Sequence, residues 1–290
     1  MKPALWLLTA MLLTLPFAPA RALSGNTMPL EIQADEALEW LDADKAYIAH
    51  GNAMARRGML TIKADTLRAD YRDSAGGASE VWRMTAEGNV VITAPSYKAG
   101  ADHAVYEIDT ETLILTGNNL TFTTTTETVT ARDTLEWHDA ASTALARGAA
   151  KITRPAGTIE ADTIEAEFTR KTGEGALILS RLVGMGKLKL VRNTDIVTAK
   201  RGVYDALADV AEVVGDVVMI TEQDVVRGRN GRFDMRSRTA RINGDVRITR
   251  GRTQMNGDSA VVDFKTGISR LLAGSGRVRG MLIPSDVSGR

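Results

Sequence analysis

The sequence contains no cysteine. Disulfide bonds are therefore excluded, and so is a lipoprotein anchor attached through an N-terminal cysteine. A chain exported to an oxidising compartment would gain nothing from that compartment in covalent cross-links. We expect its stability to come from apolar burial and backbone pairing alone.

The chain is also poor in the residue patterns that carry catalysis or bind metals. Its three histidines, His50, His103 and His138, lie in unlike contexts without metal-ligand spacing. No glycine-rich loop stands between a strand and a helix, where a phosphate would bind. We therefore predict no catalytic residues, no metal site, no cofactor and no enzymatic activity.

A long hydrophobic run occurs only near the N-terminus. Lys2 is followed by the apolar segment Leu5–Phe17, and the small residues of Ala20-Arg21-Ala22 come next. This order is typical of a secretory signal peptide, so residues 1–22 are predicted to be removed after about Ala22. An uncleaved membrane anchor is the alternative.

The formal net charge is zero, with 36 basic and 36 acidic residues, but the two signs are unevenly distributed. Residues 1–180 carry 16 basic and 24 acidic side chains, and residues 181–290 carry 20 and 12. The balance is −8 in the first part and +8 in the second. It indicates either a drift in surface composition or a molecule with unlike ends that suit different partners.

A glycine followed by a short apolar strand pattern recurs along the chain. "AEGNVVITA" around Gly88 is one copy. The glycines of the series lie 29 to 37 residues apart and are Gly51, Gly88, Gly117, Gly148, Gly184, Gly215, Gly244 and Gly274. Glycine within a strand usually marks a bulge or bend. We predict that each one is a corner where a long strand folds over.

A second element recurs at nearly fixed phase: a small residue and then a polar one. The polar positions are Asp35, Asp65, Asp102, Arg132, Asp162, Lys200, Arg229 and Asp258. The cations at three of these eight positions argue against a repeated calcium ligand. Turn residues separate segments that alternate apolar and polar with period two, and no helical period of useful length occurs. About sixteen β-strands are expected.

The stretch "LEIQADEALEWLDADKAYIAHGNAMARRGMLTIKADTLRADY" resembles the start of the OstA-like family of periplasmic lipopolysaccharide-transport proteins (LptA). Its order of an I-x-A-D strand, a turn, a G-N strand and a second I-x-A-D strand is that of the family. "LLAGSGRVRGMLIPSD" resembles the family's last strands, so the resemblance extends over residues 30–284. The typical family member is shorter, and the repeat phase slips around residues 180–200.

The resemblance implies an all-β fold: an OstA-like β-jelly roll of about sixteen antiparallel strands in two sheets, in a single, an extended or a duplicated form. The domain would cover residues 23–284, with a junction of two units near 180–200 and a C-terminal tail at 285–290. Implied partners are lipopolysaccharide through its lipid A acyl chains, an inner-membrane-anchored bitopic transport protein at one edge, the outer-membrane translocon at the other, and a second copy in head-to-tail contact. No nucleic-acid partner is expected, and the implied location is the periplasm.

Such a jelly roll has an apolar groove between its sheets, and a groove can hold acyl chains, which gain about 0.8 kcal/mol per buried CH₂. The candidate groove residues lie on apolar alternating runs and are Ile32, Leu60, Ile62, Val90, Ile92, Leu120, Phe122, Leu135 and Trp137. Each of them also fits an ordinary sandwich core. Two other functions stay open: a membrane-anchored bitopic partner of the same pathway, and a β-solenoid that serves as a surface adhesin or polysaccharide-binding protein or lyase.

Overall fold

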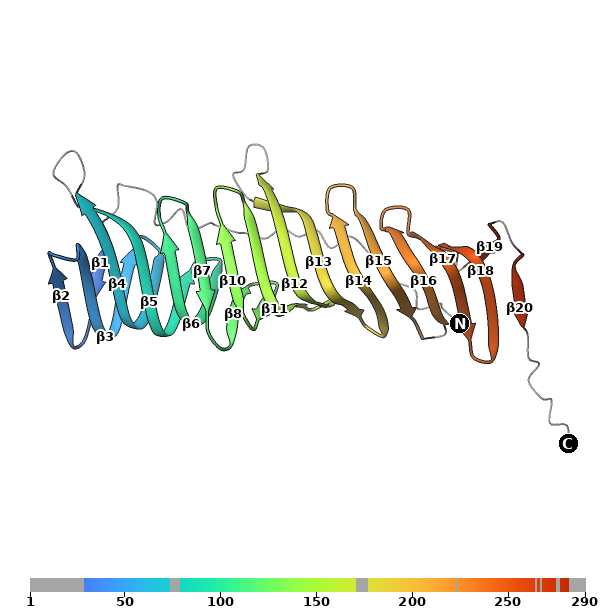
Figure 1. Cartoon of the computed structure of the whole chain (residues 1–290), viewed down its shortest axis with the longest axis horizontal. Helices are drawn as coiled ribbons and strands as arrows, with labels where there is room; N and C mark the ends of the chain where they lie inside the picture. Colours follow the sequence, from blue (N-terminus) through green and yellow to red (C-terminus); the bar gives the residue numbers. More distant parts are fainter. Residues whose placement is uncertain are drawn as a thin grey trace, which may run out of the picture. The chain divides into compact units, whose positions relative to one another are not determined.

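The computed structural model describes residues 29–281 except 74–78, 171–176, 223, 264, 267, 275 and 276. The predicted signal peptide (1–22) and C-terminal tail (285–290) lie outside these residues. The described part of the chain is all-β, with each pairing between strands antiparallel (Figure 1). A solenoid of stacked parallel strands is therefore excluded for the described residues.

The described residues form twenty strands in chain order. They are β1 (Glu31–Gln33), β2 (Ala37–Leu41), β3 (Ala46–Arg57), β4 (Leu60–Asp73), β5 (Ser79–Ala94), β6 (Tyr97–Glu107), β7 (Thr112–Thr116), β8 (Leu120–Thr124), β9 (Thr128–Ala131), β10 (Thr134–His138), β11 (Thr143–Arg154), β12 (Gly157–Arg170), β13 (Leu177–Arg192), β14 (Asp195–Asp205), β15 (Val210–Ile220), β16 (Asp224–Asp234), β17 (Thr239–Arg250), β18 (Thr253–Asp263), β19 (Ile268–Leu272) and β20 (Arg279–Met281).

The described part of the structure has twenty strands in one sheet, where about sixteen strands in two sheets were expected, and the numbers differ because four of sixteen long strands are interrupted. The pairs β1 and β2, β7 and β8, β9 and β10, and β19 and β20 each occupy the place of one long strand. The members of a pair bond to different halves of the same neighbour: β1 pairs with the end of β3, and β2 with its beginning. The interruptions fall where the uninterrupted strands bend.

The bend is a β-bulge built around the recurring glycine. Between β3 and β4 the register runs from His50↔Thr66 to Ala53↔Ala64, so two residues of β3 oppose one of β4. The two bulge residues, Gly51 and Asn52, both have positive φ, 79° and 42°. A bulge bends the strand and increases its twist. The register shifts in the same way next to Gly88, Gly215 and Gly244, so the predicted corners are confirmed there.

The corner of β13 differs from the prediction. The left-handed residues are Gly186 and Lys187, with φ of 75° and 48°, and the register shifts between Met185 and Leu188. Gly184, the predicted corner, is a buried strand residue where a Cβ would lie 2.7 Å from Cδ1 of Leu188. This glycine is needed for packing, and the bulge falls two residues later.

The second recurring element lies against these corners. Asp65 packs against Gly88, and Asn89, which follows this glycine, donates to both carboxylate oxygens at 3.2 and 2.9 Å. At two other corners the pair is ionic, with opposite orders of charge: the Nζ of Lys187 lies 3.6 Å from the carboxylate of Asp162, and the Nζ of Lys200 lies 2.8 Å from the carboxylate of Asp216. Cations and anions thus exchange places across the corner, which explains why the polar position of the repeat changes sign.

Two of the assigned polar positions are shifted by one residue. Glu36, rather than Asp35, packs against Gly51, and Asp133, rather than Arg132, packs against Gly148. Arg132 instead donates to the carboxylate of Asp133 from its Nε at 2.7 Å. The interrupted strands end at these two corners, so local geometry there departs from that of a continuous strand.

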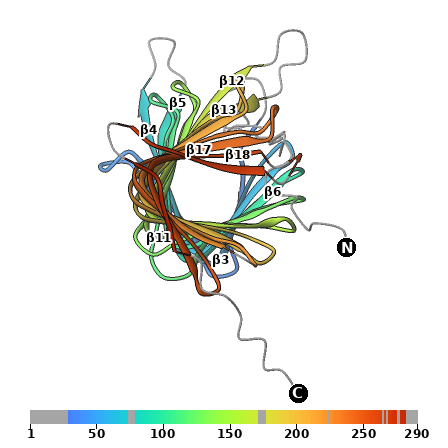
Figure 2. The same ribbon diagram turned by 90° about the vertical axis from the view of Figure 1, so that its right-hand side faces the viewer.

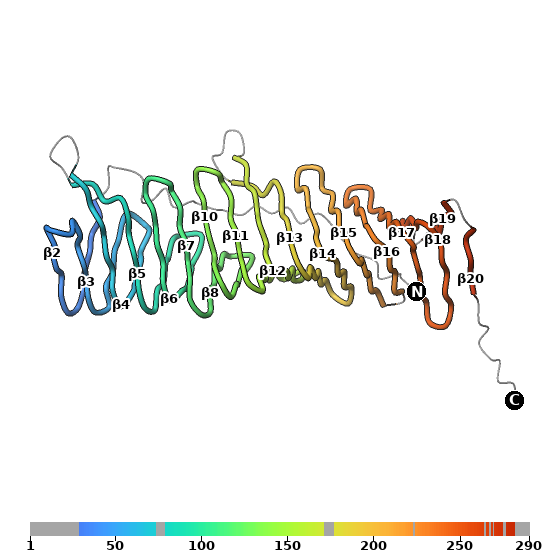
Figure 3. Tube along the Cα trace, viewed as in Figure 1, coloured from blue at the N-terminus to red at the C-terminus, as the bar shows by residue number. Residues whose placement is uncertain are grey.

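Residues of the chain group into two compact units. The described residues of the N-terminal unit are those within 29–155 and 163–180, and those of the C-terminal unit lie within 156–162 and 181–281. A junction of two units near 180–200 stays a prediction. Figure 3 follows the Cα trace of β14–β18, which run back and forth in chain order within the C-terminal unit.

The bends divide each unit into two layers. In the N-terminal unit the first layer holds β2, β7, β10 and the adjoining halves of their neighbours, and the second layer holds β1, β8, β9 and the other halves. In the C-terminal unit β19 belongs to the first layer and β20 to the second. Figure 2 looks at that unit from its end, with β17 and β18 in front. Buried side chains alternate along both halves of each strand, so the core lies on the inner faces of the bend.

Candidate functional site

An apolar row crosses the second layer of the N-terminal unit. Cross-strand pairing aligns one inward residue from each of eight strands. This second-layer row consists of Ile32, Ala55, Ile62, Ile92, Ala99, Phe122, Val129 and Ile152. Seven strand spacings make it about 34 Å long. Four of the nine predicted groove residues therefore fall on one continuous line.

The other predicted residues lie on the same inner faces. Leu60, Val90 and Leu120 belong to the second layer, two residues before Ile62, Ile92 and Phe122 on their strands, and Leu135 and Trp137 belong to the first layer. Seven of the nine side chains are at most 7% exposed. Ile32 and Phe122 are half-buried. Whether these residues bind a lipid remains a prediction.

The facing layer carries a second apolar row that the sequence pattern did not single out. This first-layer row consists of Leu38, Ala49, Leu67, Ala86, Ala104, Leu115, Leu135 and Ala146. Only Leu135 belongs to the predicted set. The signal was present, because apolar residues alternate before each glycine as they do after it. The row contains four leucines and four alanines, and this mixture of large and small side chains lets opposed faces interdigitate.

The first strands leave the end of this interior uncovered. In the described residues β2 pairs with β3 alone, and its inward side chains Leu38 and Trp40 are 60% and 66% exposed. Trp40 stacks on Tyr47 with ring centroids 6.1 Å apart, and its indole N–H donates to the hydroxyl of Tyr71 at 2.6 Å. The apolar rows therefore begin at an accessible edge that consists of two separate strands, β1 and β2.

The interior of the second layer is a poorly solvating environment. Burial raises the pKa of Tyr97 to about 12, with a smaller contribution from Tyr106. The ring of Tyr97 stacks on Phe122 at a centroid distance of 5.1 Å. Arg154 and Glu127 form an ion pair there whose side chains are 7% and 4% exposed. A buried charge is tolerated only with such a partner.

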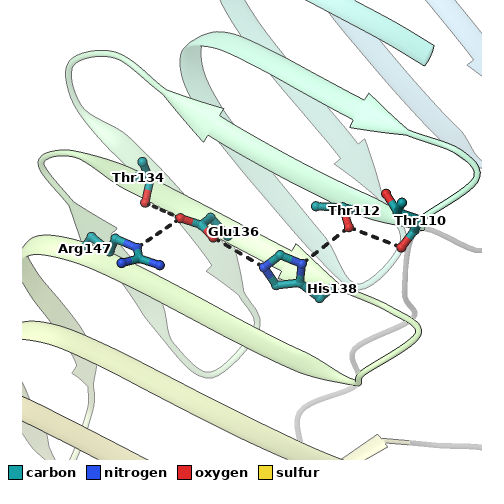
Figure 4. A network of polar contacts seen from close by, with 6 residues as sticks. All are labelled: Thr110, Thr112, Thr134, Glu136, His138 and Arg147. Carbon is teal, nitrogen blue, oxygen red and sulfur yellow. Dashed lines mark hydrogen bonds and ion pairs between the residues drawn. The ribbon is translucent and has the colours of Figure 1, made fainter.

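The outer face of the first layer, behind Leu135 and Trp137, is polar (Figure 4). The Glu136 carboxylate accepts hydrogen bonds from Thr134 Oγ1 at 2.9 Å and Arg147 Nε at 3.2 Å, and it lies 3.3 Å from His138 Nε2. Burial by itself raises the pKa of Glu136, but the bonds from Thr134 and His138 and the charge of Arg147 outweigh it and lower the pKa. The network holds neighbouring strands together from outside and does not face the apolar interior.

The three histidines share this outer face, each beside a glutamate. His50 lies 3.9 Å from Glu39 and His103 lies 3.8 Å from Glu87. Within the described ranges, no group of three or more histidine, aspartate or glutamate side chains could hold a metal ion. These residues likewise include no helix long and apolar enough to cross a membrane.

Residues 31–134 match the family model described as LptA/(LptD N-terminal domain) LPS transport protein. The predicted resemblance to the OstA-like lipopolysaccharide-transport family is confirmed for this segment. The match covers a little over a third of the chain and includes all of the predicted groove residues except Leu135 and Trp137. The predicted fold class, an all-β OstA-like jelly roll, is confirmed by the antiparallel bent strands.

Among solved structures, the chain is similar to LptH, described as the LptA homologous periplasmic component of the lipopolysaccharide transport device of Pseudomonas aeruginosa. The identity is 13%, and the match covers 55% of this chain and 95% of LptH with a TM-score of 0.26. A TM-score this low does not establish a common arrangement of strands. None of the curated proteins matches the chain.

Proposed function

We propose that the protein is a periplasmic carrier that binds lipopolysaccharide and moves it from the inner to the outer membrane. The observation that carries this proposal is the second-layer row, which runs unbroken through the segment that matches the transport family. The acyl chains of lipid A would lie along this row and the first-layer row that faces it.

The inner surface suits a flexible apolar ligand better than a polar one. A long apolar row offers many equivalent CH₂ contacts, each worth about 0.8 kcal/mol, and needs no tailored pocket. The exposed inward residues Leu38 and Trp40 provide an apolar entrance at the first strands. The deeper residues are covered by the facing layer, so acyl chains would replace contacts between the layers. A lipid would therefore enter at the edge formed by β1 and β2 and insert its acyl chains between the first-layer row and the second-layer row.

The partners follow from the open edges. Within the described residues, β1 and β2 pair only with β3, and β19 and β20 only with β18, so the backbone groups on their other sides are available to a strand of another chain. One edge would extend its sheet into the inner-membrane-anchored bitopic protein and the other into the outer-membrane translocon. Copies of the chain would join head to tail through the same edges.

Photocrosslinking in cells tests the lipid site. A photoreactive amino acid at Ile62 or Ile92 is expected to give adducts that antibodies against lipopolysaccharide detect. Lys63 is the matched control, because it is the next residue on β4 and its side chain is exposed on the outer face. Adducts of equal intensity at Ile62 and Lys63 would contradict the proposal.

The substitution Ile62→Glu separates a lipid-accessible surface from a closed core. If the layers open to lipid, water reaches the carboxylate, and the variant remains folded as judged by circular dichroism. The lipopolysaccharide adducts formed by a photoreactive amino acid at Ile92 are then expected to fall sharply in this variant. An unfolded variant would place Ile62 in a closed core. A folded variant with wild-type crosslinking would remove Ile62 from the site.

The periplasmic location has its own test. The mature protein is expected to begin near Leu23 and to fractionate with the soluble periplasm. Mass spectrometry of the mature N-terminus checks this. Full-length protein in inner-membrane pellets after a high-salt wash would instead favour the membrane-anchored bitopic partner.

A further inference from the structure

The outer face of the second layer in the C-terminal unit carries a row of basic side chains. Cross-strand pairing from β13 to β20 aligns Lys189, Thr198, Val218, Arg227, Arg247, Asn256 and Arg279. All four basic side chains of this basic row are exposed, while the alternating inward residues Val226 and Ile248 are 3% exposed. The row points away from the apolar interior.

Two arginines of this row are cross-strand neighbours of each other and not of acidic residues. Arg227 lies directly opposite Arg247 in the β16–β17 ladder, an arrangement of like charges that destabilises a sheet. Other arginines of the same strands are neutralised: Arg229 pairs with Asp245, and Arg250 with Asp224. Within the described part of the chain, neither Arg227 nor Arg247 has an acidic partner. Their guanidinium groups are available to an external anion.

An apolar row runs beside the basic one on the same outer face. Residues two positions apart on a strand share a face, so Ile220, Val225 and their neighbours lie next to the arginines. This outer apolar row consists of Val191, Ile196, Ile220, Val225, Thr249, Gln254 and Met281. Ile220 and Met281 are 37% and 65% exposed. Five of these seven residues are apolar, and they flank the arginines that have no acidic partner among the described residues.

We propose that this basic-apolar face docks onto the surface of an anionic phospholipid bilayer. Guanidinium groups bind lipid phosphates with two parallel hydrogen bonds, and the adjacent apolar side chains reach the boundary between headgroups and acyl chains. The positive balance of residues 181–290 attracts the unit to such a surface. Nucleic acid fits less well, because the two rows contain no aromatic residue on which bases could stack.

The proposal assigns the unit a second lipid contact, distinct from the inner surface. Acyl chains inside the N-terminal unit leave the outer face of the C-terminal unit free, and membrane docking needs no lipid in the interior. The two proposals therefore fail independently.

Vesicle co-sedimentation of the full mature chain tests the docking face. The probes are vesicles of phosphatidylcholine alone and of phosphatidylcholine with an equal amount of phosphatidylglycerol. Binding is expected to the anionic vesicles only, and to weaken as salt screens the charges. Equal binding to both vesicles, or no binding to either, would overturn the proposal.

A matched pair of double variants locates the contact. Arg227→Thr with Arg247→Thr is expected to lower the partition coefficient about 25-fold, because each basic residue contributes about fivefold, or ~1 kcal/mol. Arg232 and Arg241 lie opposite each other in the first layer of the same unit, so Arg232→Thr with Arg241→Thr removes the same charge from another face. This control is expected to retain most of the binding. Equal losses in both variants would show attraction by net charge alone and overturn the docking face.

The apolar contribution is tested with Ile220→Thr, which keeps a β-branched side chain on the strand. Binding to anionic vesicles is expected to fall severalfold while circular dichroism remains unchanged. Unchanged binding would overturn the apolar half of the contact. If a double variant fails to fold, competition of wild-type protein with inorganic phosphate decides: release by millimolar phosphate, at constant ionic strength, would indicate a site for the free anion and contradict a bilayer contact.

Discussion

Substitution of Gly88 by alanine tests whether the bulged corner requires glycine. Gly88 has a φ of 74°, and the added Cβ would lie 2.1 Å from Oδ2 and 2.8 Å from Cγ of Asp65. Two costs follow. An L-residue in the left-handed region costs about 1–2 kcal/mol. The carboxylate of Asp65 must also move away, which breaks its hydrogen bonds with Asn89 at about 0.5–1.5 kcal/mol.

The sum predicts that Gly88→Ala lowers the free energy of unfolding by about 1.5–3.5 kcal/mol. Urea unfolding followed by tryptophan fluorescence is the assay, because Trp40, Trp82 and Trp137 all lie in the N-terminal unit. In the mature chain, from which Trp6 is expected to be removed with the signal peptide, the fluorescence therefore reports the unit that contains the substitution.

Two control variants separate the costs. Asn89→Ala removes the hydrogen bonds and places alanine at a φ of 48°, where Ala149 at 47° already occurs in the wild-type chain. It is expected to cost about 1 kcal/mol. In Gly88→Ala with Asp65→Ala, the nearest obstructing atoms are gone, so the double variant should be no less stable than Gly88→Ala alone. A Gly88→Ala protein as stable as wild type would refute the reasoning. A double variant whose loss in the free energy of unfolding equals the sum of the losses of Gly88→Ala and Asp65→Ala would refute it too.

Three further predictions concern stability. Gly215→Val should destabilise the chain more than Val217→Ala, because the Cβ at Gly215 would meet the stem of Lys200 at 2.8 Å and φ is 87°; an equal or smaller loss in urea unfolding contradicts this. Arg154→Leu should cost about 3–5 kcal/mol by leaving Glu127 buried and unpaired, and Arg154→Leu with Glu127→Leu should recover most of it; a double variant as unstable as the single one would show that the pair itself is stabilising. Because the folded-state pKa of Glu136 is lowered, its stabilisation is present above the ordinary carboxylate pKa and is lost as the pH falls through the folded value. Glu136→Gln should therefore be less stable than wild type at neutral pH and approach it in acid, and a gap that does not change with pH contradicts the sign.

Much of the fold could be predicted from the sequence because its signals are local. Period-two alternation, turn residues and a glycine every 29 to 37 residues predict bent antiparallel strands without reference to distant contacts. The same alternation placed Ile62, Ile92 and the other candidate residues on inner faces. The sequence could not show that Ile32, Ile62, Ile92 and Phe122 form one line, because the line depends on the register of strands far apart in the chain.

Tertiary structure decided the features that depend on what lies across a ladder. Gly184 and Gly186 are alike in sequence, and only the packing of Leu188 and the register with β14 place the bulge at Gly186. The cation at Lys200 differs in sign from the aspartates at the same repeat position, and only the structure showed that Asp216 lies beside it. Arg227 and Arg247 are twenty residues apart, and a slip of one residue would turn one of them to the other face. Sequence alone fixes which residues alternate along a strand, whereas the bulges and the register fix which of them meet.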